Sequence, residues 1–149
     1  MLIGLDPLLT PELLHALAAM GHGDRIVLVD ANYPATRGRR LIRQPSADTP
    51  RVLRAILSLL PCDTFVDDPA VVMQVVGDPD AVPPVVAAMN VILRASGWPA
   101  AVAVERHAFY EAAETAYAIV QTGERRFYGT VALMKGVIAP DVAMPGDWL

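Results

Sequence analysis

The chain has 149 residues, of which 54% are apolar and 19% are charged, and its formal net charge is −4. This length suits one domain with a hydrophobic core, the composition excludes a disordered chain, and the acidic balance argues against a general affinity for nucleic acid or anionic membranes. No apolar run approaches about 18 residues, no signal-peptide pattern is present and Cys62 is the single cysteine, so we expect a cytoplasmic protein without an internal disulfide.

Helix and strand signals alternate from the N-terminus onward. Thr10 can cap a first helix, Pro11 suits its first turn, and Gly21 can end it in a left-handed conformation. One face of this helix carries Leu13, Leu14, Leu17 and Met20. The next segment, 25–30, is a nearly continuous apolar run and predicts a strand that is buried on both faces.

The middle of the chain repeats the pattern. A second helix is predicted from Thr49-Pro50, where the cap-and-proline signal recurs, to Pro61, which stops it. Its apolar stripe consists of Val52, Leu53, Ile56, Leu59 and Leu60. Residues 71–76 predict another buried strand, and Asp80 can cap a third helix that runs to about Arg94.

The last third of the chain continues the alternation. It predicts a strand, a helix and two further strands, at 101–104, 109–116, 118–121 and 131–134. Strands that alternate with helices predict a layered α/β sheet with crossover connections. We expect one domain over residues 1–138, followed by a tail, 139–149, that is rich in Pro, Gly and Asp and has no clear period.

Two polar residues that flank the first strand are candidates for a functional site. His22 lies between two glycines, where the imidazole is accessible, and histidine can exchange a proton near neutral pH. Asp30 ends the strand, and ligands of open α/β sheets usually bind beyond the carboxyl ends of strands. The alternatives are an exposed loop histidine without a role and an aspartate that caps the following turn.

A second group of candidates follows the strand at 101–104. Arg106 can donate several hydrogen bonds to ligand hydroxyls or to a carboxylate partner. His107 has no clear assignment, and Phe109 and Tyr110 are expected to pack in the core. Tyr128 stands in a loop, where a phenol can give or receive a hydrogen bond at a pocket, or can lie on the surface without a role.

The one basic concentration consists of Arg37, Arg39, Arg40 and Arg43. It suits a phosphate or nucleic-acid contact, but the acidic balance of the whole chain favours a solvated loop or one that pairs with acids of another subunit. A Gly-rich phosphate loop, a GxSxG elbow and a CxxC pair are absent, and the three histidines lack the paired spacing of a zinc site. The sequence therefore predicts no metal and no nucleotide cofactor.

Six short segments stand out in chain order: 8–14, Met20-Gly21-His22-Gly23-Asp24, 30–35, 108–111, 122–124 and Tyr128-Gly129. Together they resemble the family of L-fucose mutarotases and D-ribose pyranases, from residue 1 to about residue 138. Arg106 is closer to the fucose branch, because the ribose branch typically has a histidine at that position. Two residues depart from the family pattern: His107 replaces an apolar residue, and Thr130 replaces the asparagine that usually follows Tyr-Gly.

The resemblance implies a single-domain, three-layer α/β sandwich with a mostly parallel sheet. It also implies a homo-oligomeric ring, often a decamer of stacked pentamers, with sites between subunits. The implied activity is cofactor-free interconversion of the anomers of a free monosaccharide, with L-fucose as the first expectation and His22 as the general acid. The resemblance assigns sugar-binding roles to Asp30, Arg106, Tyr128, Gly129 and Thr130.

The spacing of His22 and Asp30 bears on assembly. Roughly six strand residues at about 3.3 Å each give about 20 Å, which is too far for one monosaccharide to bridge. Either the glycine-flanked loop folds back, or the site combines residues of two chains. Competing interpretations are a D-ribose pyranase, a non-enzymatic sugar-binding subunit of a transport system, and an interaction module that uses the basic segment at 37–43 on an anionic partner.

Overall fold

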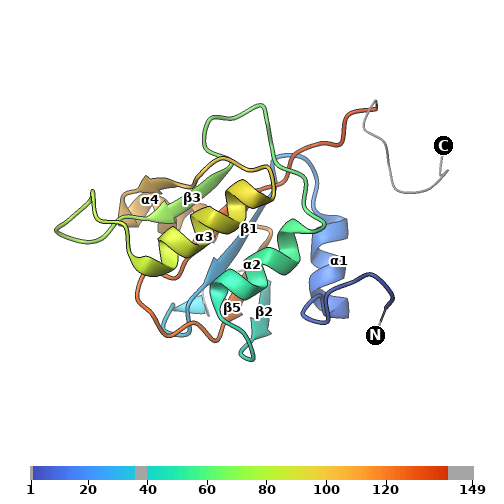
Figure 1. Cartoon of the computed structure of the whole chain (residues 1–149), viewed down its shortest axis with the longest axis horizontal. Helices are drawn as coiled ribbons and strands as arrows, with labels where there is room; N and C mark the ends of the chain where they lie inside the picture. The colour runs from blue at the N-terminus through green and yellow to red at the C-terminus, as the bar shows by residue number, and fades with distance from the viewer. Residues whose placement is uncertain (1, 36–39, 141–149) are drawn as a thin grey trace.

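A twisted sheet forms the middle layer of the computed structural model, which describes residues 2–35 and 40–140 (Figure 1). Its strands are β1 (Arg25–Val29), β2 (Leu41–Gln44), β3 (Ala70–Met73), β4 (Val102–Val104), β5 (Ala118–Thr122) and β6 (Val131–Met134). Among the described residues, their spatial order is β2-β5-β1-β6-β3-β4. The central position of β1 agrees with the prediction of a strand that is buried on both faces.

Strand β6 differs from the other strands of the described sheet in its direction. It pairs antiparallel with β1, where Leu28 lies opposite Val131, and antiparallel with β3. The remaining pairs, β1 with β5, β5 with β2, and β3 with β4, are parallel. The predicted α/β class with a mostly parallel sheet is therefore confirmed.

Helices cover both faces of this sheet. They are α1 (Pro11–Ala19), α2 (Thr49–Leu57), α3 (Pro84–Ala95) and α4 (Arg106–Glu114). Figure 1 shows α2 and α3 side by side in front of the strands, where they pack against each other. Among the described residues, no helix combines the length and the apolar character that crossing a membrane requires.

Strand β1 contributes to two separate hydrophobic clusters because successive side chains point to opposite faces of a sheet. Ile26 and Leu28 pack in the cluster that holds buried residues of α1, α2 and α3. Val27 and Val29 pack in the second cluster, together with Phe109 of α4. The predicted three-layer sandwich is thus confirmed; its division into residues 1–138 and a tail stays a prediction, because residues 141–149 lie outside the described part.

Helix α1 begins as predicted but ends differently. The Thr10 hydroxyl accepts a hydrogen bond from a first-turn backbone N–H at 3.3 Å. The predicted left-handed cap at Gly21 is wrong, since the left-handed residue is Gly23, with φ of 82°. The Lys135 ammonium instead donates to two carbonyls at the C-terminal end of the helix, at 2.6 and 2.8 Å, where a cation is favourable.

The N-caps of α2 and α3 also differ from the prediction. Asp48 caps α2 by accepting from the Arg51 backbone N–H at 3.0 Å, and Thr49 is the first helical residue. The Thr49 hydroxyl points into the protein and is fully buried. Helix α3 starts at Pro84 without a side-chain cap, so Asp80 does not cap it.

Two further helix boundaries move, and one strand was not predicted. Helix α2 ends at Leu57, so Leu59 of the predicted apolar stripe is 42% exposed. Helix α4 begins at Arg106, three residues earlier than predicted, because the Glu105 carboxylate caps it with a 2.7 Å bond from a first-turn N–H. Strand β2 was not predicted, since it is a four-residue edge strand in which the exposed Arg43 interrupts the apolar pattern.

The two aspartates before α2 and α3 allow a test of this capping assignment. We expect Asp48→Ala to lower the free energy of unfolding by about 1 kcal/mol, because one first-turn N–H of α2 loses its acceptor. Asp80→Ala is the matched control and is expected to change it by less than about 0.5 kcal/mol. Urea unfolding followed by circular dichroism measures both, and equal losses would contradict the assignment.

Candidate functional site

A hollow of about 430 Å³ lies at the carboxyl ends of β1 and β3 and the start of β6. Because β6 runs against both strands, its first residues lie beside their last residues. The hollow, called the Asp30 hollow below, is lined by Asp30, Asn32, Tyr33, Pro34, Met73, Tyr110, Phe127, Tyr128 and Thr130. It brings together three predicted ligand-binding residues, Asp30, Tyr128 and Thr130, and its volume suits a small molecule.

Asp30 supplies a buried carboxylate to this hollow. It is 8% exposed, and Oδ1 accepts a hydrogen bond from the Asn32 backbone N–H at 2.9 Å. Burial raises the pKa of the Asp30 carboxyl, the nearby Glu124 carboxylate acts in the same direction, and the N–H groups of Asn32 and Tyr33 oppose both. The second oxygen is a strong acceptor for a ligand hydroxyl.

Tyr128 is held in an unusual backbone conformation, with φ of 63°, which is left-handed and uncommon for a residue other than glycine. Its phenolic oxygen accepts a hydrogen bond from the Val76 backbone N–H at 3.1 Å. Since that bond uses only an acceptor site, the hydroxyl hydrogen stays available for donation to a ligand.

Arg106 lies outside the Asp30 hollow. It is the first residue of α4 and lines an adjoining depression of about 260 Å³, together with Gln74, Val76 and Glu105. Val76 connects this depression with the Asp30 hollow. It lines the depression, and its backbone N–H donates to the Tyr128 hydroxyl, which lies at the hollow. Arg106 therefore lies beside the Asp30 hollow, at the rim that Val76 forms, and does not line it.

Gly129 and Thr130 contribute differently from the prediction. The Gly129 carbonyl accepts from the Thr49 hydroxyl at 2.7 Å, so this oxygen serves the fold. Thr130 lines the hollow, and its hydroxyl is shielded from solvent and has no hydrogen-bond partner within the described part of the chain. A buried polar atom without a hydrogen-bond partner lowers the stability of the fold, and a ligand that pairs with it removes this penalty.

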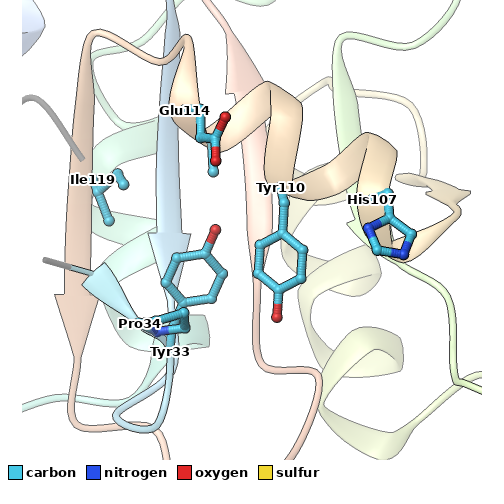
Figure 2. A pocket seen from close by; sticks show the side chains of 7 residues that line it. Tyr33, Pro34, His107, Tyr110, Glu114 and Ile119 are labelled. Atoms are coloured by element: carbon cyan, nitrogen blue, oxygen red, sulfur yellow. The ribbon is translucent and has the colours of Figure 1, made fainter. Parts of the chain in front are cut away.

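Two tyrosines separate the Asp30 hollow from a second one, of about 420 Å³ (Figure 2). The rings of Tyr33 and Tyr110 lie 5.5 Å apart, and Figure 2 shows the Tyr33 hydroxyl directed toward Glu114 and the Tyr110 hydroxyl directed the opposite way. Burial, and then the charges of Tyr110, Glu114 and Asp30, raise the pKa of Tyr33 to about 12, so this phenol keeps its proton. Tyr110, expected to be a packing residue, lines both hollows, whereas Phe109 is fully buried as expected.

His22 lies at the opposite end of β1. Its side chain is 47% exposed, and Nε2 is 3.1 Å from Oδ2 of Asp63, a carboxylate that is almost completely buried. The Phe65 ring lies 5.7 Å from the imidazole, and its backbone N–H donates to the other Asp63 oxygen at 3.0 Å. Because a carboxylate can only accept, Nε2 carries the proton in this pair and Nδ1 is the nitrogen left for a ligand.

The pairing of β1 with β6 shows how far His22 is from the Asp30 hollow. Near His22, the Gly23 N–H bonds to the Lys135 carbonyl, and at the other end Leu28 lies opposite Val131. The ladder is continuous between them, so the separation is roughly 20 Å. The glycine-flanked loop does not fold back, and a single chain does not bring His22 and Asp30 together.

Asp63 is the functional candidate that sequence reasoning missed. It is 41 residues from His22, and it follows a helix stop without any local motif. The fold brings Asp63 to His22 because the backbone of Cys62 forms an antiparallel β-bridge with that of Lys135, and Lys135 in turn lies beside the start of β1. No spacing rule within either segment signals this contact.

The described arginines of the basic segment make contacts within the fold. Arg40 donates to His15 at 2.9 Å and lies over the Tyr117 ring, and Arg43 donates to Gln121. Arg37 and Arg39 lie outside the described residues. Within 2–35 and 40–140, no group of three or more His, Cys, Asp or Glu residues is close enough together to hold a metal ion.

The chain is similar to known proteins over nearly its whole length. The model of the RbsD / FucU transport protein family matches residues 3–138. The fucose mutarotase of Homo sapiens is 47% identical over 144 residues, which cover 91% of this chain and 94% of that protein. A solved fucose mutarotase from Streptococcus pneumoniae, in complex with L-fucose, has a TM-score of 0.86 at 38% identity and covers 93% of this chain and 100% of that one. Bacillus subtilis RbsD complexed with D-ribose has a TM-score of 0.74 at 18% identity over the same shares, which shows a common fold alone.

The raised pKa of Asp30 predicts a pH-dependent stability. A carboxyl whose pKa is higher in the folded state costs stability as pH rises from the unfolded pKa, near 3.9, through the folded value. We therefore expect Asp30→Asn to be more stable than the wild type at neutral pH, and the gap to close as pH falls to about 3. Urea unfolding across this pH range measures the gap.

Glu124→Gln provides the contrast for this measurement. Although burial raises the pKa of the Glu124 carboxyl, its hydrogen bonds and ion pair with Arg126 outweigh it and lower the pKa. Glu124 therefore contributes stability above the unfolded pKa, and this contribution is lost as pH falls. Gaps of the same sign for the two variants at neutral pH would contradict the assigned directions.

Proposed function

This chain belongs to the RbsD / FucU transport protein family, and on that premise we propose that it is an isomerase that interconverts the α and β anomers of L-fucose. The observation that carries the proposal is the near-full-length similarity to fucose mutarotases, one of which was solved with L-fucose. The Asp30 hollow supports it, since carboxylate, phenol and hydroxyl groups line a space of monosaccharide size.

Mutarotation needs only proton transfers. One group takes the proton of the anomeric hydroxyl while another protonates the ring oxygen; the ring opens to the aldehyde, the bond rotates, and the ring closes on the other face. We assign the ring-oxygen proton to His22, whose Nδ1 faces away from Asp63. General acid–base assistance of this kind is worth about 10²–10⁴-fold, which requires no cofactor.

Asp63 acts as the positioning residue for His22. Its buried carboxylate accepts from Nε2, which fixes the ring orientation and stabilises the imidazolium that forms when His22 takes up a proton. The Phe65 N–H holds the carboxylate in turn. This pair supplies the histidine with an orienting partner that the sequence did not reveal.

Sugar hydroxyls are assigned to the Asp30 hollow. Asp30 accepts from a hydroxyl, Tyr128 donates its phenolic hydrogen, and Arg106 contributes from the rim. We assign the sugar contact expected of Gly129 to its N–H, because its carbonyl accepts from Thr49. Thr130, in the position where asparagine is usual, offers a shorter side chain and so reaches a smaller part of the sugar.

We further propose that each site is shared by two copies of the chain in a homo-oligomer. The His22 end of one copy faces the Asp30 hollow of the next, because the two halves lie about 20 Å apart at opposite ends of β1. Contacts between opposite ends of neighbouring copies are heterologous. They generate a closed ring when the rotation from one copy to the next adds up to a full turn. The exposed Phe65 beside His22 gives this end an apolar contact surface.

Two other functions remain alternatives within this site. A D-ribose pyranase would use the same proton transfers on another sugar, but Arg106 speaks for the fucose branch. A sugar-binding transport subunit, as the family description suggests, would bind without accelerating anomer exchange. The transport subunit has no need of the His22–Asp63 pair, which acid–base catalysis on either sugar would use.

Saturation-transfer NMR on L-fucose tests the proposed activity. We expect the wild-type protein to accelerate exchange between the α and β anomers, and His22→Ala to reduce this acceleration by about 10²–10⁴-fold. Parallel measurements on D-ribose separate the two sugars. Binding of L-fucose without any acceleration would favour the transport subunit and overturn the enzymatic proposal.

Mixed oligomers test the shared site. Coexpressed His22→Ala and Asp30→Asn chains are each expected to be inactive alone, but a random mixture regenerates about a quarter of the sites with both native residues. The matched control mixes His22→Ala with Asp63→Asn, two changes at the same end of the chain, and it is expected to regenerate none. Recovery in neither mixture would indicate that the site lies within one chain.

A further inference from the structure

The loop from Gly123 to Thr130 carries three residues of the Asp30 hollow, Phe127, Tyr128 and Thr130. It connects β5 to β6 and belongs to neither strand. The precision of the hollow therefore depends on what holds this loop, and the groups that do so are not themselves part of the lining.

Glu124 is the buried centre of the loop. Its residue is 2% exposed, and its carboxylate accepts three hydrogen bonds from Arg126: from the backbone N–H and Nε to Oε1, both at 2.8 Å, and from a terminal guanidinium nitrogen to Oε2 at 2.7 Å. A buried carboxylate with several charge-assisted donors is a strong anchor. The Glu124 backbone carbonyl also accepts from Ala31, next to Asp30, at 2.9 Å.

The stem of the Glu124 side chain lies directly against Gly129. A Cβ placed on Gly129 would be only 2.4 Å from Glu124 Cγ, a distance that such atoms do not reach without a shift. Glycine at 129 is therefore required by the close approach of the side chain. Between Arg126 and Gly129, the backbone takes its left-handed conformation at Tyr128.

From these contacts we infer that Glu124 is a positioning residue that sets the affinity for the sugar through Tyr128. It locks the 123–130 loop from within, by its bonds to Arg126 and its packing under Gly129, and so fixes the phenol at the edge of the hollow. The inference rests on the proposed function. It does not give Glu124 any contact with the sugar.

The test compares KM and kcat for L-fucose mutarotation. Since Glu124→Ala releases the loop but leaves His22 untouched, we expect KM to rise by about 10-fold and kcat to change by less than about 3-fold. Glu124→Gln keeps the length and one acceptor oxygen, so it is expected to rescue KM to within about 3-fold of the wild type. A lower kcat or yield of Glu124→Ala with an unchanged KM would show a merely structural role and overturn the inference.

A double-mutant cycle isolates the packing contact. Gly129→Ala alone is expected to raise KM, because the added methyl displaces Glu124. In Glu124→Ala/Gly129→Ala the clashing Cγ is absent, so the second change is expected to add nothing to the first. Additive increases would mean that Gly129 acts by another route and would contradict the lock. Asp48→Ala, which removes the exposed outer partner of Arg126 together with the α2 cap, is the control and is expected to leave KM unchanged.

Hydrogen exchange over residues 123–130 separates this inference from the proposed function. If the wild-type protein does not accelerate anomer exchange, the enzymatic proposal fails. In that case, faster exchange in Glu124→Ala than in the wild type, with α2 unchanged, still supports the lock. Unchanged exchange in the loop would overturn the lock, whatever the activity.

Discussion

The antiparallel insertion of β6 between β1 and β3 decides which residues of this chain meet. In a purely parallel sheet, the strand ends at one edge would all be carboxyl ends, and the start of a strand would lie at the other edge. Because β6 is reversed, Thr130 at its start lies beside Asp30 at the end of β1 and Met73 at the end of β3. The hollow exists where these three ends converge.

The same reversal determines what lies at the other edge. The end of β6 leads into Lys135, which bonds to α1, to Gly23 and to the segment that carries Asp63. One strand thus organises the Asp30 hollow at its start and the His22–Asp63 pair at its finish. The distance between the two is fixed by the length of the ladder, which is why we assign the complete site to two chains.

Two buried carboxylates, Asp30 and Glu124, differ in how the protein compensates their charge. Asp30 is buried with backbone donors only, which leaves its pKa raised and its charge poorly compensated. Glu124 is buried with a guanidinium, which holds its pKa below the ordinary value. A carboxylate that is available to a ligand lowers the stability of the free protein, whereas one that is engaged with Arg126 supports the loop around it.

The sequence by itself determined the local features of the protein. The buried run of β1, the Thr10 cap, the alternation of strands and helices, and the exposed His22 and strand-ending Asp30 follow from residue types and spacing over a few positions. The resemblance to a sugar-isomerase family rested on such short segments, and the family match supports it. These features are readable because their causes lie within one or two turns of chain.

Only the tertiary structure decided which distant groups came together. Asp63 contacts His22, which is 41 residues away in the sequence, and Tyr110 packs against Tyr33 at the hollow. Asp48 caps α2 in place of the expected Thr49, whose hydroxyl donates to the Gly129 carbonyl instead. The edge strand β2 forms through its pairing with β5, not through its own apolar pattern. Pairings of this kind depend on the order and direction of strands in the sheet, and no local pattern in the sequence encodes them.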